Sequence, residues 1–395
     1  MVSNTVKIVT VIAVIAVVAI GVGIYAMNSD SGIKTNEDGL AVNTPCDPYT
    51  FTDLAGQTYT FDHHFGAVCL QMSLQGGAFS TMADFFGTDL PKYIAGLDDL
   101  DEASPDLKVA WYDALPELKD CKSIGWIGYG EDPAHVLAIK PNALIEPVIM
   151  KDRVESTGVA SELKKAGIPI IYIDFHGEDV EKIKQSIKIL GMMFGKEKKA
   201  DKLATEYATK ANAVYDKVRE LLKNNPRPSA YSELATYGSD TLGHSYGNDS
   251  MWGALLYRCG GENLLKSGQS VLDTSYILSS DPDVIIFVTG HGTDGGLIPA
   301  GFDATEDLIN ETTKQYFDDR PGWKELSAYK EGHVYVVSQS ICRELCDYVS
   351  IEFLAKCIWP EEFEDVDPMD DLKDYYKNHT PVKFKGVWYQ QVSFD

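Results

Sequence analysis

Side chains that could hold a ligand gather in one glycine- and serine-rich segment, residues 231–252. This segment, "YSELATYGSDTLGHSYGNDSMW", contains Tyr237, His244, Tyr246 and Trp252 without the regular spacing of core residues. Aromatic rings offer flat apolar walls to a macrocycle or a catecholate, and Tyr or His can also ligate iron. We therefore predict that these four residues contact a ligand. The alternative is that the rings pack beneath the loop.

Further candidates lie in loops that follow predicted strands, because ligands of open α/β sheets bind beyond the carboxyl ends of the strands. Arg343 could neutralise a carboxylate or phosphate of the ligand, and its alternative role is a surface ion pair. For Ser73 the alternative is a helix N-cap. The predicted ligand contacts in these loops are Met72, Ser73, Gln75, Phe79, Tyr129, His291 and Arg343.

No residue pattern indicates catalysis or a bound metal. The seven cysteines are irregularly spaced and odd in number, which does not describe a disulfide framework. Among the eight histidines only His63 and His64 are adjacent, and there is no HExxH motif. A nucleophile elbow and a triad order are missing as well. The sequence therefore predicts a protein that is not an enzyme and that has no catalytic residue, no metal and no cofactor.

The acidic composition restricts the partners. The formal net charge is -24 at pH 7, whereas binding to nucleic acid requires clustered Lys and Arg that neutralise phosphates. No nucleic-acid partner is expected, and an anionic ligand would need a local basic or polar pocket.

Short apolar runs alternate with segments of helical period over two parts of the chain. Runs such as "IPIIYID" and "DVIIFVTG" are strand-like, and the pattern of strand, helix, strand predicts largely parallel sheets. Residues 178–225 have a helical pattern with Gly191 and Gly195 as interruptions, and they separate the two parts. The predicted fold class is therefore α/β, with two Rossmann-like lobes joined by a single long helix and preceded by an N-terminal transmembrane helix. The predicted segments are a membrane anchor or signal (1–28), a flexible tether (29–50), an N-terminal lobe (51–195), a bridging helix (196–225) and a C-terminal lobe with an acidic and aromatic tail (226–395).

The transmembrane prediction rests on the uncharged run "IVTVIAVIAVVAIGVGIYAM", residues 8–27, which has about the 20 residues needed to cross a bilayer as a helix. Lys7 precedes the run and Asp30 follows it, so the positive-inside bias places the bulk of the chain outside the cell. A cleaved signal peptide is the alternative. We expect a protein held at the cell membrane by one N-terminal anchor.

Seven stretches, in this order and spacing, resemble the substrate-binding proteins of ABC transporters for iron-siderophore, haem and cobalamin uptake. The resemblance runs from about residue 51 to about residue 360. The stretches are "FTDLAGQTYTF", "DPAHVLAIKPNALIE", "LKKAGIPIIYID", "LGMMFGKEKKADKLATEYATKANAVYDKV", "LLYRCGGENLL", "TSYILSSDPDVIIFVTG" and "PGWKELSAYKEGHVYVV".

The resemblance implies the extracytoplasmic, monomeric binding component of an ABC importer. Such a protein captures its ligand in a cleft between two lobes and delivers it to a permease driven by an ATPase. The expected ligand is an iron complex, either a ferric siderophore or haem. A cobalamin or another corrinoid is the alternative within the family, and a membrane-anchored surface sensor or enzyme is the alternative of a different class.

One part of the family pattern is missing. Members commonly carry a glutamate near the start of a short helix in each lobe, which docks onto permease arginines. The matching positions here are Ala134 and Ser275. We predict that the neighbouring Glu131 and Asp273 take over the docking.

Overall fold

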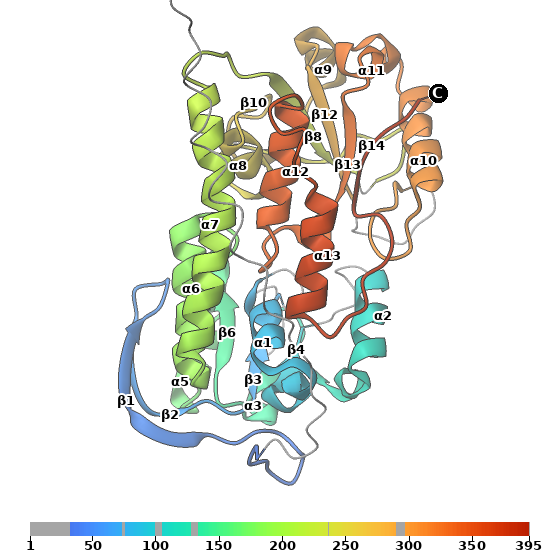
Figure 1. Cartoon of the computed structure of the whole chain (residues 1–395). Coiled ribbons are helices and arrows are strands. Elements are labelled where there is room, and N and C mark those ends of the chain that lie inside the picture. Colours follow the sequence, from blue (N-terminus) through green and yellow to red (C-terminus); the bar gives the residue numbers. More distant parts are fainter. Residues whose placement is uncertain are drawn as a thin grey trace, which may run out of the picture. The chain divides into compact units, whose positions relative to one another are not determined.

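The computed structural model describes residues 32–72, 76–98, 105–127, 133–235, 237–289 and 297–394. Residues 34–395 form one compact unit, and this unit contains two five-stranded sheets. Figure 1 shows one sheet near each end of the unit, with a long helix beside both.

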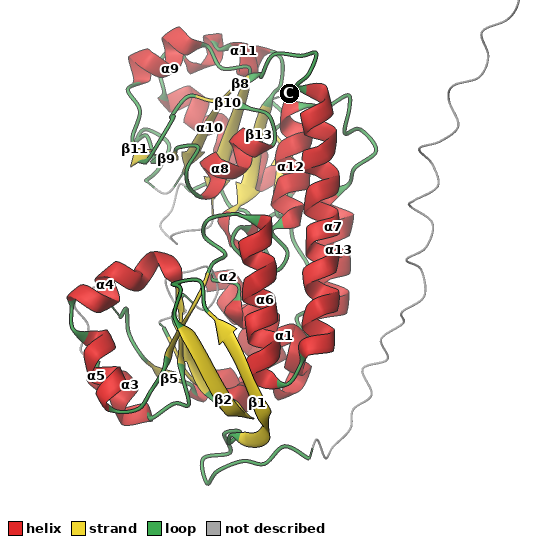
Figure 2. Ribbon diagram, turned by 90° about the vertical axis from the view of Figure 1, so that its left-hand side faces the viewer, coloured by secondary structure: helices red, strands yellow, loops and turns green. Residues whose placement is uncertain are grey.

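The sheet of the first lobe has five parallel strands in the order β5-β4-β3-β6-β7. All residues of β3, β4, β6 and β7 are buried, as expected where helices cover both faces of a parallel sheet. Helices α3 to α5 cover one face, and α1 and α6 cover the other (Figure 2). The strands are β3 (Val68–Leu70), β4 (Ile94–Leu97), β5 (Lys122–Ser123), β6 (Leu144–Pro147) and β7 (Ile170–Ile173), and the helices are α1 (Ala78–Phe86), α2 (Pro105–Ala114), α3 (Ala134–Ile139), α4 (Lys151–Ser156), α5 (Val159–Lys165) and α6 (Val180–Phe194).

An antiparallel hairpin of β1 (Thr44–Thr52) and β2 (Thr58–His64) precedes this sheet. Its first strand begins inside residues 29–50, for which the sequence predicts a flexible tether. Ala41 is buried, and its backbone donates a hydrogen bond to Lys92 O and accepts one from Ala67 N. The ordered part of the first lobe therefore starts earlier than its apolar pattern indicates, because backbone hydrogen bonds hold a polar segment against it.

A single long helix, α7 (Glu197–Leu221), links the first lobe to the second. It packs against α6 and against α12 (Tyr348–Ile358) of the second lobe. Its buried residues recur every three or four positions, which is the pattern of a helix with one apolar face. Gly191 of α6 allows a close approach to α7, since a Cβ there would lie 2.3 Å from Ala200 Cβ.

The second lobe has a sheet in the order β10-β8-β12-β13-β14. The first four strands are parallel, and β14 pairs antiparallel with β13. The central strand β12, with sequence VIIFVT, is wholly buried. The strands are β8 (Ser229–Leu234), β9 (Ser245–Tyr246), β10 (Glu262–Asn263), β11 (Gln269–Ser270), β12 (Val284–Thr289), β13 (Val334–Ser338) and β14 (Tyr389–Gln391), and the further helices are α8 (Met251–Arg258), α9 (Thr274–Ser280), α10 (Glu306–Asp319), α11 (Ser327–Lys330) and α13 (Pro368–His379).

The C-terminal tail connects the lobes a second time. Helix α13 packs on α12, and Nδ1 of His379, its last residue, lies 2.9 Å from Asp84 Oδ1 on α1 of the first lobe. The acidic start of this helix is held as well, because Asp371 Oδ1 pairs with Lys210 Nζ on α7 at 2.5 Å.

The predicted fold class is wrong in one part. Two α/β lobes and a long helix are present, but no helix among the described residues is both long and apolar enough to cross a membrane. The longest of them, α7, has 25 residues and carries lysines and glutamates along its outer face. Residues 1–28, to which the prediction applied, lie outside the described part of the chain. The fold class is corrected to two α/β lobes joined by a long helix.

Candidate functional site

Two loops at the carboxyl ends of strands meet where the lobes join. One follows β7 in the first lobe and covers residues 174–178. The other follows β13 in the second lobe and covers residues 339–347. We call these two loops, together with Arg258 of α8, the interlobe junction. Ligands of parallel sheets bind at such strand ends, which makes this junction the candidate site.

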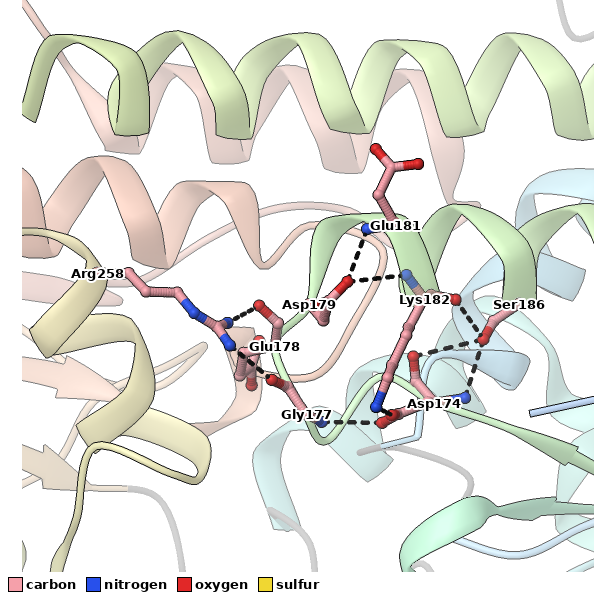
Figure 3. A network of polar contacts seen from close by, with 8 residues as sticks. All are labelled: Asp174, Gly177, Glu178, Asp179, Glu181, Lys182, Ser186 and Arg258. Atoms are coloured by element: carbon pink, nitrogen blue, oxygen red, sulfur yellow. Dashed lines mark hydrogen bonds and ion pairs between the residues drawn. The ribbon is translucent and has the colours of Figure 1, made fainter. Parts of the chain in front are cut away.

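Direct contacts join the two sides of the junction. Arg343 Nη1 lies 3.0 Å from His176 Nε2, and the Cys342 thiol donates to Glu178 Oε1 at 3.0 Å. Arg258 donates to the carbonyls of Glu178 and Gly177, the latter at 3.2 Å, as Figure 3 shows. The loop of the first lobe is thus bound to the second lobe by both its backbone and its side chains.

The same loop is also fixed within the first lobe (Figure 3). Asp179 caps α6, because its Oδ1 accepts from the amides of Glu181 and Lys182 at 3.0 and 3.1 Å. Asp174 Oδ1 accepts from Gly177 N at 2.9 Å, and its Oδ2 pairs with Lys182 Nζ at 3.2 Å. A loop bound at so many points presents its side chains in one arrangement.

Arg343 and His176 form a buried hydrogen-bonded pair. Both side chains are at most 5% exposed. Burial, and then the neighbouring Arg343 charge, hold the His176 pKa well below its usual value, so the ring is neutral. Arg343 therefore donates to Nε2, which places the ring proton on Nδ1. This nitrogen is buried and has no hydrogen-bond partner among the described residues, so it can donate to a ligand.

The glycine-rich segment 231–252 brings aromatic side chains to this pair. The rings of Tyr237 and His244 meet edge to face, with centroids 6.0 Å apart. Burial raises the pKa of Tyr246, which also interacts electrostatically with Arg343 and Tyr237. Tyr246 therefore lies within electrostatic range of both Arg343 and Tyr237. We call His176, Tyr237, His244, Tyr246 and Arg343 the aromatic-basic cluster.

A buried ion pair supports the loop that carries Tyr237 and His244. Arg320 and Glu233 form two parallel hydrogen bonds of 2.7 and 2.8 Å, and both are at most 4% exposed. Arg320 also donates to the carbonyls of Ser239 and Thr241 at 2.8 and 3.0 Å. The loop is therefore attached to the core of the second lobe through Arg320.

Gly243 sits at the tightest point of this loop. Its amide donates to Glu233 Oε1 at 2.8 Å, and a Cβ would lie 1.8 Å from the Leu234 carbonyl oxygen. Gly243→Ala should therefore destabilise the protein by about 1–3 kcal/mol through overpacking, measured by urea unfolding. Gly238→Ala is the matched control in the same loop, because a Cβ there meets nothing within 4 Å and only the left-handed backbone is strained. A smaller loss at Gly243 than at Gly238 would contradict this.

Two predicted ligand contacts lie in the protein core. Phe79 on α1 is 1% exposed and packs edge to face on Trp111, with centroids 4.9 Å apart. Trp252 on α8 is also 1% exposed, and its Nε1 donates to Gln339 Oε1 at 2.5 Å. Both locations favour packing over ligand contact, and neither residue is carried into the proposed site.

Some of the other predicted residues lie in the described part of the chain, and the rest lie outside it. Met72, with φ 51°, packs against the apolar cluster on the α3–α5 face of the first sheet. Asp273 is exposed at the N-cap of α9, with Ser275 in the first turn, and Ala134 is exposed at the start of α3. The predicted residues Ser73, Gln75, Tyr129, Glu131 and His291 lie outside the described residues.

Sequence reasoning missed several residues of the junction. His176 and Glu178 stand in "YIDFHGED", directly after a strand that the sequence predicts. The rule applied to the other strand ends would have identified both. Nothing in the sequence pairs them with Arg343 and Cys342, which lie more than 160 positions away.

Two surface hollows of the first lobe contain no predicted site residue. One, of about 580 Å³, lies between β2, α4 and β7, and the other, of about 510 Å³, lies beside α6. A third cavity, between the lobes, of about 20 Å³, has room for a single water molecule. The described part of the chain holds no group of three or more His, Cys, Asp or Glu suited to a metal ion.

Comparison with known proteins identifies the family. Residues 135–340 match the model of the family described as periplasmic binding protein. A solved structure of a TroA-like periplasmic binding protein, FepB, from Veillonella parvula has 32% sequence identity and a TM-score of 0.81, over 88% of this chain and 100% of that one. The chain therefore belongs to the periplasmic binding protein family, as the sequence resemblance predicts.

One more distant relative agrees with this assignment, and a further solved structure shares the fold. A Bacillus subtilis (strain 168) protein described as an uncharacterized ABC transporter substrate-binding lipoprotein, YvrC, is 22% identical over 253 residues, which cover 63% of this chain and 71% of that protein. A structure titled ABC-type Fe3+-hydroxamate transport system, from Saccharomonospora viridis DSM 43017, has 16% identity and a TM-score of 0.51 over 79% of this chain and 99% of that one, and shows the fold alone. This chain is a substrate-binding component of an ABC transporter, a class of transport protein that works with a permease and an ATPase.

Proposed function

We propose that this protein captures an iron complex, a ferric siderophore or haem, at the interlobe junction and delivers it to the permease of an ABC importer from the outer side of the membrane. The observation that carries the proposal is the aromatic-basic cluster, in which Arg343 contacts His176, Tyr237 contacts His244, and Tyr246 interacts electrostatically with both Arg343 and Tyr237. The aromatic rings suit the flat, apolar parts of a chelate or a porphyrin. The guanidinium suits the carboxylates or the anionic oxygens of the ligand.

The cluster also explains how a strongly acidic protein could hold an anionic ligand. The net charge of -24 is spread over the whole chain, and exposed charges are screened within ~8 Å at physiological salt. A buried arginine acts at contact distance. A corrinoid remains the second candidate, because the same aromatic walls suit a near-neutral macrocycle.

The other predicted contacts belong to the same proposal. Ser73 and Gln75 follow β3 in the sequence, Tyr129 follows β5, and His291 follows β12. Docking to the permease is assigned to Glu131 and Asp273. Asp273 supports this role by its exposed position on the second lobe.

A fluorescence titration tests the ligand assignment. The full chain is titrated with a ferric hydroxamate, a ferric catecholate, haem and cobalamin, and the quenching of its tryptophan fluorescence is followed. We expect saturable quenching by one of the three iron complexes. Saturation by cobalamin alone would replace the iron assignment with the corrinoid, and no response to any of the four would overturn both.

Arg343→Met tests the part of the cluster in ligand binding. Loss of a charge-assisted hydrogen bond, worth about 1.5–3 kcal/mol, should weaken the binding of the iron complex about 10-fold to 100-fold. Arg343→Lys keeps the charge without the planar fork and should give an intermediate loss. Arg219→Met, which removes an exposed arginine on α7, is the control. An unchanged Kd for Arg343→Met would exclude Arg343 from the site.

A further inference from the structure

The C-terminal tail reaches back from the second lobe to the first. Its helix α13 ends at His379, whose Nδ1 lies 2.9 Å from Asp84 Oδ1 on α1. The ring of Tyr375 stacks on this imidazole, with centroids 5.4 Å apart. Asp84 is 5% exposed, and its Oδ2 pairs with Lys199 Nζ at 3.1 Å. We call the His379–Asp84 contact the α1 clasp.

A second contact joins the tail to the first lobe through the segment before α10. Gly301 of this segment and Val387 of the tail exchange two backbone hydrogen bonds of 2.7 and 3.1 Å. The next amide, Phe302 N, donates to Asp106 Oδ2 on α2 of the first lobe at 2.7 Å. Gly301 permits this close approach, because a Cβ there would lie 2.4 Å from the same carboxylate oxygen. We call the Phe302–Asp106 contact the α2 clasp.

Aromatic side chains pack the tail against the first lobe. The rings of Phe302, Tyr376 and Trp388 have centroids 4.9–5.6 Å apart, and all three residues are at most 5% exposed. Tyr376 also lines the interlobe cavity of about 20 Å³, together with Phe79 on α1 and Trp111 on α2. A space of this size holds at most one water molecule, so the tail and the first lobe are in close contact there. This contact accounts for the burial of Phe79.

We propose that residues 368–394 form an interlobe strap, which holds α1 and α2 of the first lobe against the second lobe and limits how far the lobes separate. The strap is built into the second lobe by the pairing of β14 with β13. In Figure 1, α13 lies between α7 on the left and α2 on the right, so the strap joins the lobes at a second place besides α7. Separation of the lobes therefore has to break the clasps. The effect of the strap on the ligand rests on the proposed function, whereas its effect on lobe separation does not.

Amide hydrogen exchange of the full chain tests whether the two clasps act together. His379→Leu breaks the α1 clasp, and its readout is the amide of Phe302 in the α2 clasp. Asp106→Ala breaks the α2 clasp, and its readout is the amide of Leu345, which donates to Ser80 Oγ on α1 at 3.2 Å. A strap predicts that each substitution makes exchange at the other helix about tenfold faster, the effect of losing one hydrogen bond to a charged group.

Two further variants serve as controls. His379→Asn can donate to Asp84 in place of the imidazole and should restore wild-type exchange, because a carboxylate accepts from either donor. Lys373→Met breaks an exposed ion pair with Asp370 within α13 and should leave both readouts unchanged. Unchanged exchange at the other helix in both clasp variants, or no recovery in His379→Asn, would overturn the strap. Equal acceleration in the buried strand β12 would also overturn it, since the substitutions would then act through general stability.

Stopped-flow fluorescence measures the effect on the ligand separately. With the iron complex that quenches the wild type, His379→Leu should raise the association and dissociation rates together, by about the factor measured for exchange, because both steps need the lobes to separate. Rates equal to those of the wild type would contradict the effect on the ligand. The exchange results need no ligand, so a failure of the iron assignment and a failure of the strap can be told apart.

Discussion

Arg320→Met should lower the free energy of unfolding by about 3–5 kcal/mol, the cost of leaving one partner of a buried ion pair without the other. Glu233 would remain at 1% exposure with no cation, and Tyr231 Oη, at 2.9 Å, would be its main remaining side-chain donor. The guanidinium also faces the rings of Phe287, Tyr316 and Trp323, at 4.5–5.7 Å from their centroids. Chemical unfolding in urea measures the loss.

A double variant distinguishes the effect of losing the ion pair from the effect of losing the packing contacts of Arg320. Arg320→Met combined with Glu233→Gln removes the uncompensated charge, so the double variant should recover part of the lost stability. Arg219→Met, which breaks an exposed ion pair on α7, should cost less than about 1 kcal/mol. A loss below about 1 kcal/mol for Arg320→Met would show that this pair does not hold the loop of Tyr237 and His244.

Stability should fall as the pH rises from 6.5 to 8, and Glu344 should account for about 2 kcal/mol of the fall. Glu344 lies between the lobes, where its carboxyl group interacts with Ser80 and with the amides of Gly76 and Gly77. Burial raises its pKa from 4.5 to about 8. The folded state therefore holds a proton that the unfolded state has already released. The stability linked to this proton is fully present below pH 4.5 and is lost as the pH rises through about 8.

Between pH 6.5 and 8, the carboxyl groups with raised pKa values all lower the stability as the pH rises. Glu352, whose pKa burial raises to about 8, and Glu146, whose pKa is also raised by burial, act in the same direction as Glu344. His176 acts in the opposite direction, since its depressed pKa removes stability as the pH falls below 6.5. Between pH 6.5 and 8 these carboxyl groups release their protons in the folded state, and stability declines.

Thermal unfolding of Glu344→Gln over this range is the measurement. The variant cannot ionise, so its stability should fall less steeply between pH 6.5 and 8 than that of the wild type. Glu361→Gln, at an exposed position, should keep the wild-type slope. A Glu344→Gln slope equal to that of the wild type would show that Glu344 is ionised throughout.

Local sequence patterns predicted the buried strands and the amphipathic helix, because these elements depend on residues that are close together in the sequence. A run such as VIIFVT favours a strand buried on both faces, and β12 is wholly buried. The three- and four-residue spacing of apolar side chains predicts the inward face of α7. The order of such elements is sufficient to identify the family. The N-terminal limit of the first lobe was missed, because β1 is polar and is defined by its pairing with β2.

The candidate site was predicted only in part, for a physical reason. Composition directed attention to the glycine-rich segment that contains Tyr237, His244 and Tyr246, but it could not tell which aromatic side chains turn inward, and Trp252 is in the core. The sequence by itself determined the two lobes, the helix between them and the loops rich in ligand-binding residue types. Only the tertiary structure decided that His176 meets Arg343 and that Glu178 meets Cys342. These contacts join loops from different lobes, so they depend on how α7 and α12 pack, and no local periodicity encodes that.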